Sequence, residues 1–510
     1  MARKTAYADH EGMFSGSRVE RAIIDIGSNT VRLVVYGGAP RAPNVLFNEK
    51  VAARLGRDIA ETGQLADEAV ELALRGLRRF ALLLREWRIA KVDVVATAAV
   101  REASNGADFL SEVRDLGFEP RLLAGADEAR ISAMGVIGAF PGNRGIVADL
   151  GGGSLELIAF ADNVPGNGTS LPLGTLRLPE HRGQAGGGEM AATLAAMLNN
   201  ISLGHREGDT LYLVGGTWRA MAVVAMSARD YPLSDPHGFH MAADKARRLV
   251  GRLADLSPEE LQGNPRITSM RASYLPDAGI LLGALLDRLR PDRVVFSSWG
   301  LREGVLFDEL EDFTKAQDPL LAGVGEFANS RGTPPVLATR IAAWTVGASK
   351  HANGTPTYGS ERLRLSATML ALASMQIEPN LRTALAMDWA LHKRWVDVDA
   401  AGRAMMAATV AANKNDCDLP PELTELASAD ELEEAIGWGL AIRLCRRLGG
   451  RSNALLNVSR LTIEEETLVL QLEPPFADLF GLPNEKDLRL LAERLGLSPE
   501  FRIVEPAEPA

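Results

Sequence analysis

Two stretches of the chain repeat one plan, and this repeat limits the possible folds more than any other feature. Residues 21–38 read RAIIDIGSNTVRLVVYGG, and residues 145–160 read GIVADLGGGSLELIAF. In each stretch an apolar run ends at an Asp-x-Gly turn and a second apolar run follows, which is the pattern of a β-hairpin. Aligned on the turn, Asp25 falls on Asp149. Because helices and further strands follow each hairpin, the repeat predicts two related α/β domains that face each other.

Length and composition limit the class of protein. A chain of 510 residues is too long for a single core. The formal net charge of −11 argues against nonspecific nucleic-acid binding, so no DNA partner is expected. Two cysteines, Cys417 and Cys445, argue against a disulfide framework and fit a reducing compartment. Since no apolar run has the length of a signal peptide or a membrane span, we expect a cytoplasmic protein with no membrane partner.

The pattern of the chain changes near its last third. Long stretches such as RLRLSATMLALASM and ADELEEAIGWGLAIRLCRRL place apolar residues three and four apart, which predicts an all-α region. Near the end, NALLNVSRLTIEEETLVLQLE alternates like strands, and NEKDLRLLAERLGL returns to a helical pattern. The predicted organisation is a polar leader (1–20), α/β domain I (21–140), α/β domain II (141–315) and a mainly helical C-terminal domain (316–510).

Three glycine-rich turns indicate phosphate binding. Glycine lets backbone N–H groups approach a phosphate with no side chain in the way. Tight hairpin geometry would explain any one of these turns, but three in a two-domain fold favour a phosphate cleft. The candidate phosphate-binding residues in the turns are Gly27, Ser28, Asn29, Thr30, Gly151, Gly152, Gly153, Ser154, Gly215, Gly216 and Thr217.

Acidic residues accompany two of the turns. Asp149 precedes the triple-glycine turn, and Glu156 lies within the apolar run that follows it. A sheet-edge position in water would make Glu156 unremarkable, whereas a central strand would place its carboxylate in the cleft. Carboxylates repel phosphate oxygens unless a hard cation such as Mg²⁺ lies between them. We therefore expect a hydrated Mg²⁺ at Asp149 and Glu156, with Asp25 as the matching ligand of the first hairpin.

Two arginines are candidate phosphate ligands. Arg32 occupies the position in the first hairpin that Glu156 occupies in the second. Its guanidinium either pairs with phosphate or neutralises an acidic neighbour, and the sequence leaves both open. Arg101 ends the predicted strand that contains ATAAVR and is a second candidate.

Seven motifs follow one another between about residue 22 and residue 307. They are IDIGSNTVRLVV, VVATAAVREASNG, AGADEARISAMGV, ADLGGGSLELI, LPLGTLRL, VGGTWRAMA and SSWGLREGVL. In this order they resemble the exopolyphosphatase/guanosine pentaphosphate phosphohydrolase family, within the actin, Hsp70 and sugar-kinase superfamily. The resemblance implies two actin-like (ribonuclease H-like) α/β domains that face a cleft, and hydrolysis of the terminal phosphate of polyphosphate or guanosine pentaphosphate. It also implies Mg²⁺, a monovalent cation as a further cofactor, a role in the stringent response, and a homodimer.

The resemblance also assigns a general base. Asp127 and Glu128 lie where a helix is expected to begin, and acidic residues there commonly offset the helix macrodipole. The family's base matches Glu128, which would take a proton from the attacking water. A helix start lowers a carboxyl pKa and a bound polyanion raises it, so we expect a tuned pKa only with substrate present. Asp149 and Glu156 complete the expected catalytic group.

One feature of the longer family members is missing. Their helical domain resembles a metal-dependent HD phosphohydrolase, but this chain contains no His-Asp dipeptide. A second, metal-dependent active site is therefore not expected, and the C-terminal domain is interpreted as a channel wall or a dimerisation module. Two other functions remain open: a phosphotransferase that moves the terminal phosphate of polyphosphate to a nucleotide, and a non-catalytic alarmone sensor.

Overall fold

The chain divides into two compact units in the computed structural model. One unit contains residues 1–231 and 236–317, and the other contains residues 232–235 and 318–510. The structure describes residues 19–182, 187–349, 358–449 and 452–505. Nearly all of the predicted polar leader therefore lies outside the described residues.

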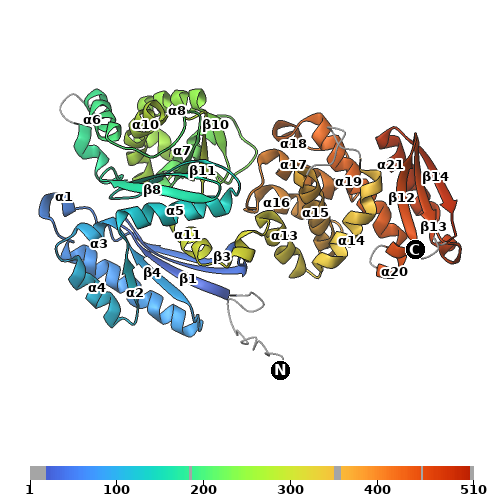
Figure 1. Cartoon of the computed structure of the whole chain (residues 1–510), viewed down its shortest axis with the longest axis horizontal. Coiled ribbons are helices and arrows are strands. Elements are labelled where there is room, and N and C mark those ends of the chain that lie inside the picture. The colour runs from blue at the N-terminus through green and yellow to red at the C-terminus, as the bar shows by residue number, and fades with distance from the viewer. Residues whose placement is uncertain (1–18, 183–186, 350–357, 450–451, 506–510) are drawn as a thin grey trace. The chain divides into compact units, whose positions relative to one another are not determined.

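The first unit begins with a five-stranded sheet in the order β3-β2-β1-β4-β5 (Figure 1). Its strands are β1 (Val19–Ile26), β2 (Val31–Ala39), β3 (Ala42–Val51), β4 (Val92–Ala96) and β5 (Pro120–Leu122). The first three strands form an antiparallel meander, and β4 and β5 then add in parallel on the other side of β1. The predicted hairpin at residues 21–38 is β1 and β2, with the Asp-x-Gly turn between them.

The second sheet repeats this topology. Its order is β8-β7-β6-β9-β11-β10. The strands are β6 (Gly145–Leu150), β7 (Leu155–Ala161), β8 (Val164–Leu171), β9 (Thr210–Val214), β10 (His240–Ala242) and β11 (Arg293–Ser297). Here β6, β7 and β8 form the meander, and β9 and β11 are the added parallel strands. The two hairpins seen in the sequence are therefore the starts of two equivalent sheets, as predicted.

Helices α5 (Gly125–Ala139) and α11 (Leu301–Asp308) pack together and against both sheets. Their contact depends on glycine, because a Cβ on Gly304 would lie 1.8 Å from the carbonyl oxygen of Ile131. Ile131 shares a buried cluster with Ile23 of β1, and Ala133 shares another with Ile158 of β7. The predicted boundary after residue 140 thus falls at the end of a helix that both sheets share.

Other helices cover the outer faces of the two sheets. Side chains from α2 (Asp67–Glu86) and α4 (Gly106–Asp115) share one core with the first sheet. The second sheet shares its core with α6 (Gly187–Asn199), α7 (Gly216–Ser227), α8 (Ala243–Asp255) and α10 (Ser269–Leu289). Periodic apolar residues on each helix account for these contacts.

The second unit is mainly helical and ends in a small sheet. Helix α17 is buried along nearly its whole length, which makes it the centre of this unit. The helices are α13 (Pro319–Asn329), α14 (Pro335–Thr345), α15 (Tyr358–Ala373), α16 (Arg382–His392), α17 (Ala400–Ala412), α18 (Pro421–Leu426), α19 (Ala429–Leu448), α20 (Asn453–Asn457) and α21 (Leu482–Leu495). The sheet has the order β12-β13-β14, formed by Ser459–Glu464, Thr467–Leu472 and Ser498–Ile503.

Two further sequence expectations can be compared with this unit. Both cysteines are free thiols, as the composition predicted. The strand-like run that begins at residue 453 first forms the short helix α20, and only then β12 and β13. Across the described residues, no helix combines the length and the apolar character needed to cross a membrane.

Candidate active site in the cleft of the first unit

The turns of the two hairpins have the same internal hydrogen bond. The backbone N–H of Gly27 donates to the carbonyl oxygen of Thr30 at 3.0 Å, and Gly151 donates to Ser154 at the same distance. The strand registers also match, because Asp25 lies opposite Arg32 just as Asp149 lies opposite Glu156. The aligned positions in the sequence are therefore equivalent positions in space.

The two turns meet across the cleft. A Cβ on Gly152 would lie 3.0 Å from Cβ of Ser28 and 3.2 Å from the backbone nitrogen of Asn29. Within the described residues, the backbone N–H groups of Ser28, Asn29, Gly152 and Gly153 have no hydrogen-bond acceptor. The close approach thus requires glycine and leaves four backbone donors for a ligand.

These turns line a cavity of about 410 Å³. Every predicted site residue except Arg101 lines it, including the third turn at Gly215, Gly216 and Thr217. Gly215 has φ of 122°, and a Cβ there would lie 2.5 Å from the carbonyl oxygen of Leu150. Only glycine fits this position, because other residues rarely adopt that backbone conformation.

The carboxylate of Glu156 is buried beside this cavity, and that of Asp149 is half-buried there. Ser132 donates to Oδ2 of Asp149 at 2.5 Å, and Ser170 donates to Oε1 of Glu156 at 2.8 Å. Burial raises the pKa of Asp149, and burial together with the nearby carboxylates of Glu128 and Asp149 raises the pKa of Glu156 well above its usual value. Two buried acids that repel each other form a site that a cation would stabilise.

Glu128 lies in the first turns of α5 and is 8% exposed. Burial raises its pKa to about 7, although the hydrogen bond and the charge of Arg101 oppose the rise. Nη1 of Arg101 donates to Oε2 of Glu128 at 3.0 Å. The sequence led us to expect a raised pKa only with substrate bound, but in the structure desolvation raises it without any ligand.

Arg101 differs from its prediction in two ways. Strand β4 ends at Ala96, and Arg101 lies on the short helix α3 (Ala98–Glu102), whose alanines favour a helix. Its side chain contacts Glu128 and the carbonyl oxygen of Leu123, and it does not line the cavity of the turns. The structure therefore places Arg101 against the expected base and not against the glycine turns.

Several cations line the cavity, and the sequence singled out only Arg32. Lys50 on β3 lies opposite Arg32 in the strand register, and Arg271 in the first turn of α10 extends over the third glycine turn. A Cβ on Gly216 would lie 3.0 Å from Nη2 of Arg271. Burial, Arg271 and Arg32 lower the pKa of Lys50. None of the ion pairs formed by described residues includes Arg32, Lys50 or Arg271, so these three cations line the wall without an ion-paired carboxylate.

The residues partly fit the expected magnesium ion. Asp149 and Glu156 supply carboxylate oxygens, which Mg²⁺ prefers, and burial raises the pKa of both. Asp25 fits less well, because its Oδ2 accepts a hydrogen bond from Nη1 of Arg302 at 3.1 Å. Among the described residues, no three His, Cys, Asp or Glu side chains converge as a ligand set. Mg²⁺ commonly binds through one or two carboxylates plus water and substrate phosphates, which agrees with this arrangement.

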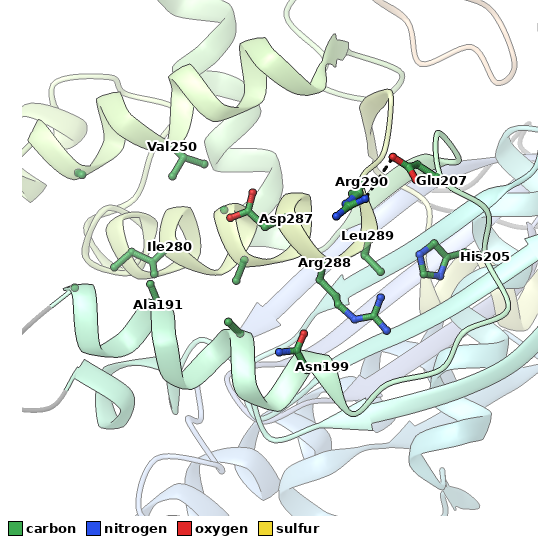
Figure 2. Close-up of a pocket in the computed structure, with 15 residues that line it drawn as sticks. Ala191, Asn199, His205, Glu207, Val250, Ile280, Asp287, Arg288, Leu289 and Arg290 are labelled. Carbon is green, nitrogen blue, oxygen red and sulfur yellow. Dashed lines mark ion pairs between the residues drawn. The ribbon is translucent and has the colours of Figure 1, made fainter.

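A larger cavity in the same unit shares no residue with the cleft. It has a volume of about 950 Å³ and lies where α6, α8 and α10 meet (Figure 2). Ala191, Val250 and Ile280 line its apolar part, and His205, Arg288 and Arg290 lie toward its other side. No predicted site residue belongs to it, so volume alone does not identify the active site here.

Unpaired backbone donors, buried carboxylates and cations in one cleft between two equivalent α/β domains define a phosphate-handling protein. The chain belongs to the Ppx/GppA phosphatase family, whose sequence model matches residues 34–313, just over half of its length. Residues 318–510, which make up nearly all of the second unit, lie beyond the matched residues.

Individual relatives agree with this assignment. Exopolyphosphatase 1 of Mycobacterium leprae is 27% identical over 305 residues, which cover 57% of this chain and 89% of the relative. Exopolyphosphatase 1 of Mycobacterium tuberculosis is 28% identical over 309 residues, or 57% of this chain and 88% of the relative. A crystal structure of the Aquifex aeolicus family member covers 59% of this chain and 100% of its own, with 25% identity and a TM-score of 0.51.

Proposed function

We propose that this protein is an exopolyphosphatase, which hydrolyses the terminal phosphate of inorganic polyphosphate. One observation carries the proposal: a single cavity combines free backbone donors, a buried glutamate with a raised pKa, and cations without acidic partners. The names of the mycobacterial relatives support the same substrate class. Several cations along one wall suit a polyanion with many phosphoryl groups better than a phosphate monoester with one.

Glu128 is the proposed general base. Its pKa of about 7 allows the carboxylate to accept a proton near neutral pH and still be partly ionised. It takes a proton from a water molecule as the water oxygen bonds to the terminal phosphorus. The bridging P–O bond breaks in line, and the electron pair leaves with the shortened polyphosphate chain. Arg101 holds the Glu128 carboxylate in place and is proposed as a positioning residue.

The turns bind the phosphoryl oxygens. The backbone N–H groups of Ser28, Asn29, Gly152 and Gly153 can donate to oxygens that gain negative charge in the transition state. Mg²⁺ held by Asp149 and Glu156 would supply further neutralisation of that charge. Lys50 and Arg271 are proposed to bind phosphates that follow the terminal one in the chain. Guanosine pentaphosphate, with a shorter run of phosphates, is the second proposed substrate, and the same residues would hold it.

The test is phosphate release from long-chain polyphosphate and from guanosine pentaphosphate by the wild-type protein and by Glu128→Gln. Wild-type release that the variant loses supports the assignment, and unchanged release by the variant contradicts it. Adding a nucleoside diphosphate tests the phosphotransferase alternative, because a transferase would form nucleoside triphosphate and release little free phosphate. Tight polyphosphate binding without turnover by the wild type would favour a sensor. The homodimer and the cytoplasmic location remain predictions.

A further inference from the structure

The second unit contains a cluster of cations where α17 and α19 approach each other. A Cβ on Gly439 of α19 would lie 2.4 Å from the carbonyl oxygen of Thr409 on α17, so the backbones nearly touch there. Arg443, Arg446 and Arg447 follow Gly439 by one and two helical turns and therefore continue the same face of α19. This face leads to the C-terminal end of α17.

The charges in this cluster are poorly balanced. Arg443 and Arg447 share one carboxylate, Asp487, at 2.9 Å and 3.3 Å. Arg382, the first residue of α16, is 8% exposed and donates to the carbonyl oxygens of Met375 and Ile377. Within the described part of the chain, no ion pair includes Arg382 or Lys414, the residue that follows the cap of α17. Arg382, Lys414, Arg443 and Arg447 therefore have only one ion-paired carboxylate, that of Asp487, among them.

The excess of positive charge acts directly on the amine of Lys414. Burial lowers the pKa of its amine, and the charges of Arg382, Arg446, Arg443 and Arg447 lower it further, to about 8. The four arginines come from two helices, α16 and α19, and all of them act on the one ammonium group that follows α17. A multiply charged anion placed among them would remove the repulsion.

An unpaired hydrogen-bond donor lies in the same place. Asn413, the C-cap of α17, is fully buried, and its Oδ1 accepts a hydrogen bond from Nη1 of Arg446 at 2.7 Å. Its Nδ2 has no partner in the structure. A buried donor without an acceptor is costly, and the adjoining cations make an anionic acceptor the natural partner.

Helix electrostatics explains only part of the cluster. Lys414, Arg446 and Arg447 lie at helix C-termini, where positive charge offsets the macrodipole. Arg382, however, lies at the start of α16, where the helix dipole disfavours a cation. Compensation of helix dipoles also leaves the Nδ2 group of Asn413 without a hydrogen-bond acceptor. A bound anion accounts for all of these features together.

We propose that Arg382, Asn413, Lys414, Arg443 and Arg447 form a binding site for a phosphate-bearing anion in the second unit. Its ligand class is an oligophosphate, either free or carried by a nucleotide, because several adjacent cations and an amide donor match several phosphoryl oxygens. The site shares no residue with the cleft and lies beyond the residues matched to the phosphatase family. Binding there requires no catalysis, so the proposal does not depend on the proposed activity.

Hydrogen exchange of the full chain locates the ligand. Tripolyphosphate is added at millimolar concentration with a metal chelator present, which prevents metal-dependent turnover. We expect slower exchange in peptides that cover residues 405–418 and 436–449, whatever happens at the glycine turns. Labelling with an amine-acylating reagent near pH 8 should show Lys414 shielded at least about fivefold, and the exposed Lys486 on α21 unaffected. Protection limited to the glycine turns, with Lys414 labelled as fast as before, would overturn the proposal.

Variants separate binding from folding. Lys414→Ala removes a repelled charge, so it should fold at least as well as the wild type and weaken local tripolyphosphate binding about tenfold. Asn413→Asp places a carboxylate among the cations, so it should raise the melting temperature and abolish local binding. Lys486→Ala removes the same charge from an exposed surface and should change neither. Local binding that survives both Lys414→Ala and Asn413→Asp would contradict the assignment of these residues.

A second probe distinguishes a site for free oligophosphate from a site for a nucleotide. GTP, again with chelator, carries the same number of phosphates as tripolyphosphate plus a nucleoside. Local affinities within about threefold of each other support a site for the phosphates alone, and a GTP affinity at least tenfold higher supports a nucleotide site. Failure of both probes to protect residues 405–418 would overturn the proposal.

Discussion

Glu156 lies directly opposite Asp149 across the antiparallel pair of β6 and β7. In the equivalent pair of the first sheet, Asp25 lies opposite Arg32, so the first hairpin brings opposite charges into register and the second brings like charges. Burial of two facing carboxylates raises the pKa of each. The two hairpins therefore carry opposite charges at this position, which makes only the second hairpin suited to a cation.

The first prediction concerns stability and pH. The folded state holds the proton of Glu156 more tightly than the unfolded chain, whose pKa is near 4.5, so the unfolding free energy falls as the pH rises above that value. Glu156→Gln removes this effect. With a divalent-cation chelator at pH 8, we expect its melting temperature to exceed that of the wild type by about 2–8 °C. Thermal unfolding from pH 5 to pH 8 measures the difference.

The same variant tests the cation. Mg²⁺ should raise the melting temperature of the wild type, because it binds only the folded state, and should not raise that of Glu156→Gln. Glu180→Gln changes an exposed glutamate of the same unit and should respond like the wild type. An equal Mg²⁺ response in all three proteins would show that Glu156 does not hold the ion.

The second prediction is the loss of turnover in Glu128→Gln. The amide cannot accept the proton of the attacking water, so we expect phosphate release to fall by a factor of about 10² to 10⁴. Polyphosphate binding should remain, since the amide keeps the shape of the side chain. Asp127→Asn alters the exposed acid beside it in the same helical turn and should stay within about twofold of the wild type. Similar losses in both variants would point to a disturbed helix start instead of a missing base.

Local patterns explain which parts of the site the sequence could predict. The first two glycine turns and the Asp149–Glu156 pair each lie within one hairpin, so a short stretch of sequence contains each of them. Lys50 could have been found by extending the register of the first hairpin to its third strand, where it faces Arg32. Arg271 carries no such signal, because only tertiary packing brings the start of α10 to the third turn. The cluster around Lys414 likewise depends on the packing of separate helices.

The third prediction concerns the pH dependence of activity. Glu128 must be ionised to act as a base, so kcat/KM should rise with pH through its pKa of about 7. Arg101→Met removes the cation that lowers this pKa, and the rising limb should move to higher pH. A pH profile of kcat/KM from pH 5 to pH 9 measures the shift. Arg130→Met, which removes an arginine paired with Asp308 away from the cavity, should leave the limb in place. A uniform loss at every pH in Arg101→Met would mean that Arg101 acts on substrate and not through Glu128.

The fourth prediction concerns the cationic wall. Arg271→Ala should raise KM for long-chain polyphosphate about tenfold and change kcat less than threefold, because Arg271 is proposed to bind phosphates that do not react. The weakening of binding with added salt should also become less steep, since one charge contact is lost. Lys245→Ala removes an exposed charge on α8 and serves as the control. A fall in kcat with KM unchanged would place Arg271 at the reacting phosphate.

The fifth prediction uses a glycine that positions the triple-glycine turn without touching a ligand. A Cβ on Gly174 would lie 2.3 Å from the carbonyl oxygen of Gly152 and 2.3 Å from the carbonyl carbon of Gly153. Both contacts are backbone, so Gly174→Ala must displace the turn and should destabilise the unit by about 1–3 kcal/mol. The free N–H groups of the turn move with it, and we expect phosphate release to fall at least tenfold at a temperature where the variant remains folded.

Gly251→Ala is the matched control, because a Cβ at this position in α8 meets nothing within 4 Å. Alanine is the better helix former, so this variant should gain up to about 1 kcal/mol of stability and keep full activity. If activity requires the turn in its present position, Gly174→Ala should lower both the stability and the phosphate release, and Gly251→Ala should lower neither. Full activity in a folded Gly174→Ala protein would show that the cleft tolerates a displaced turn, and the four backbone donors would then lose their proposed role.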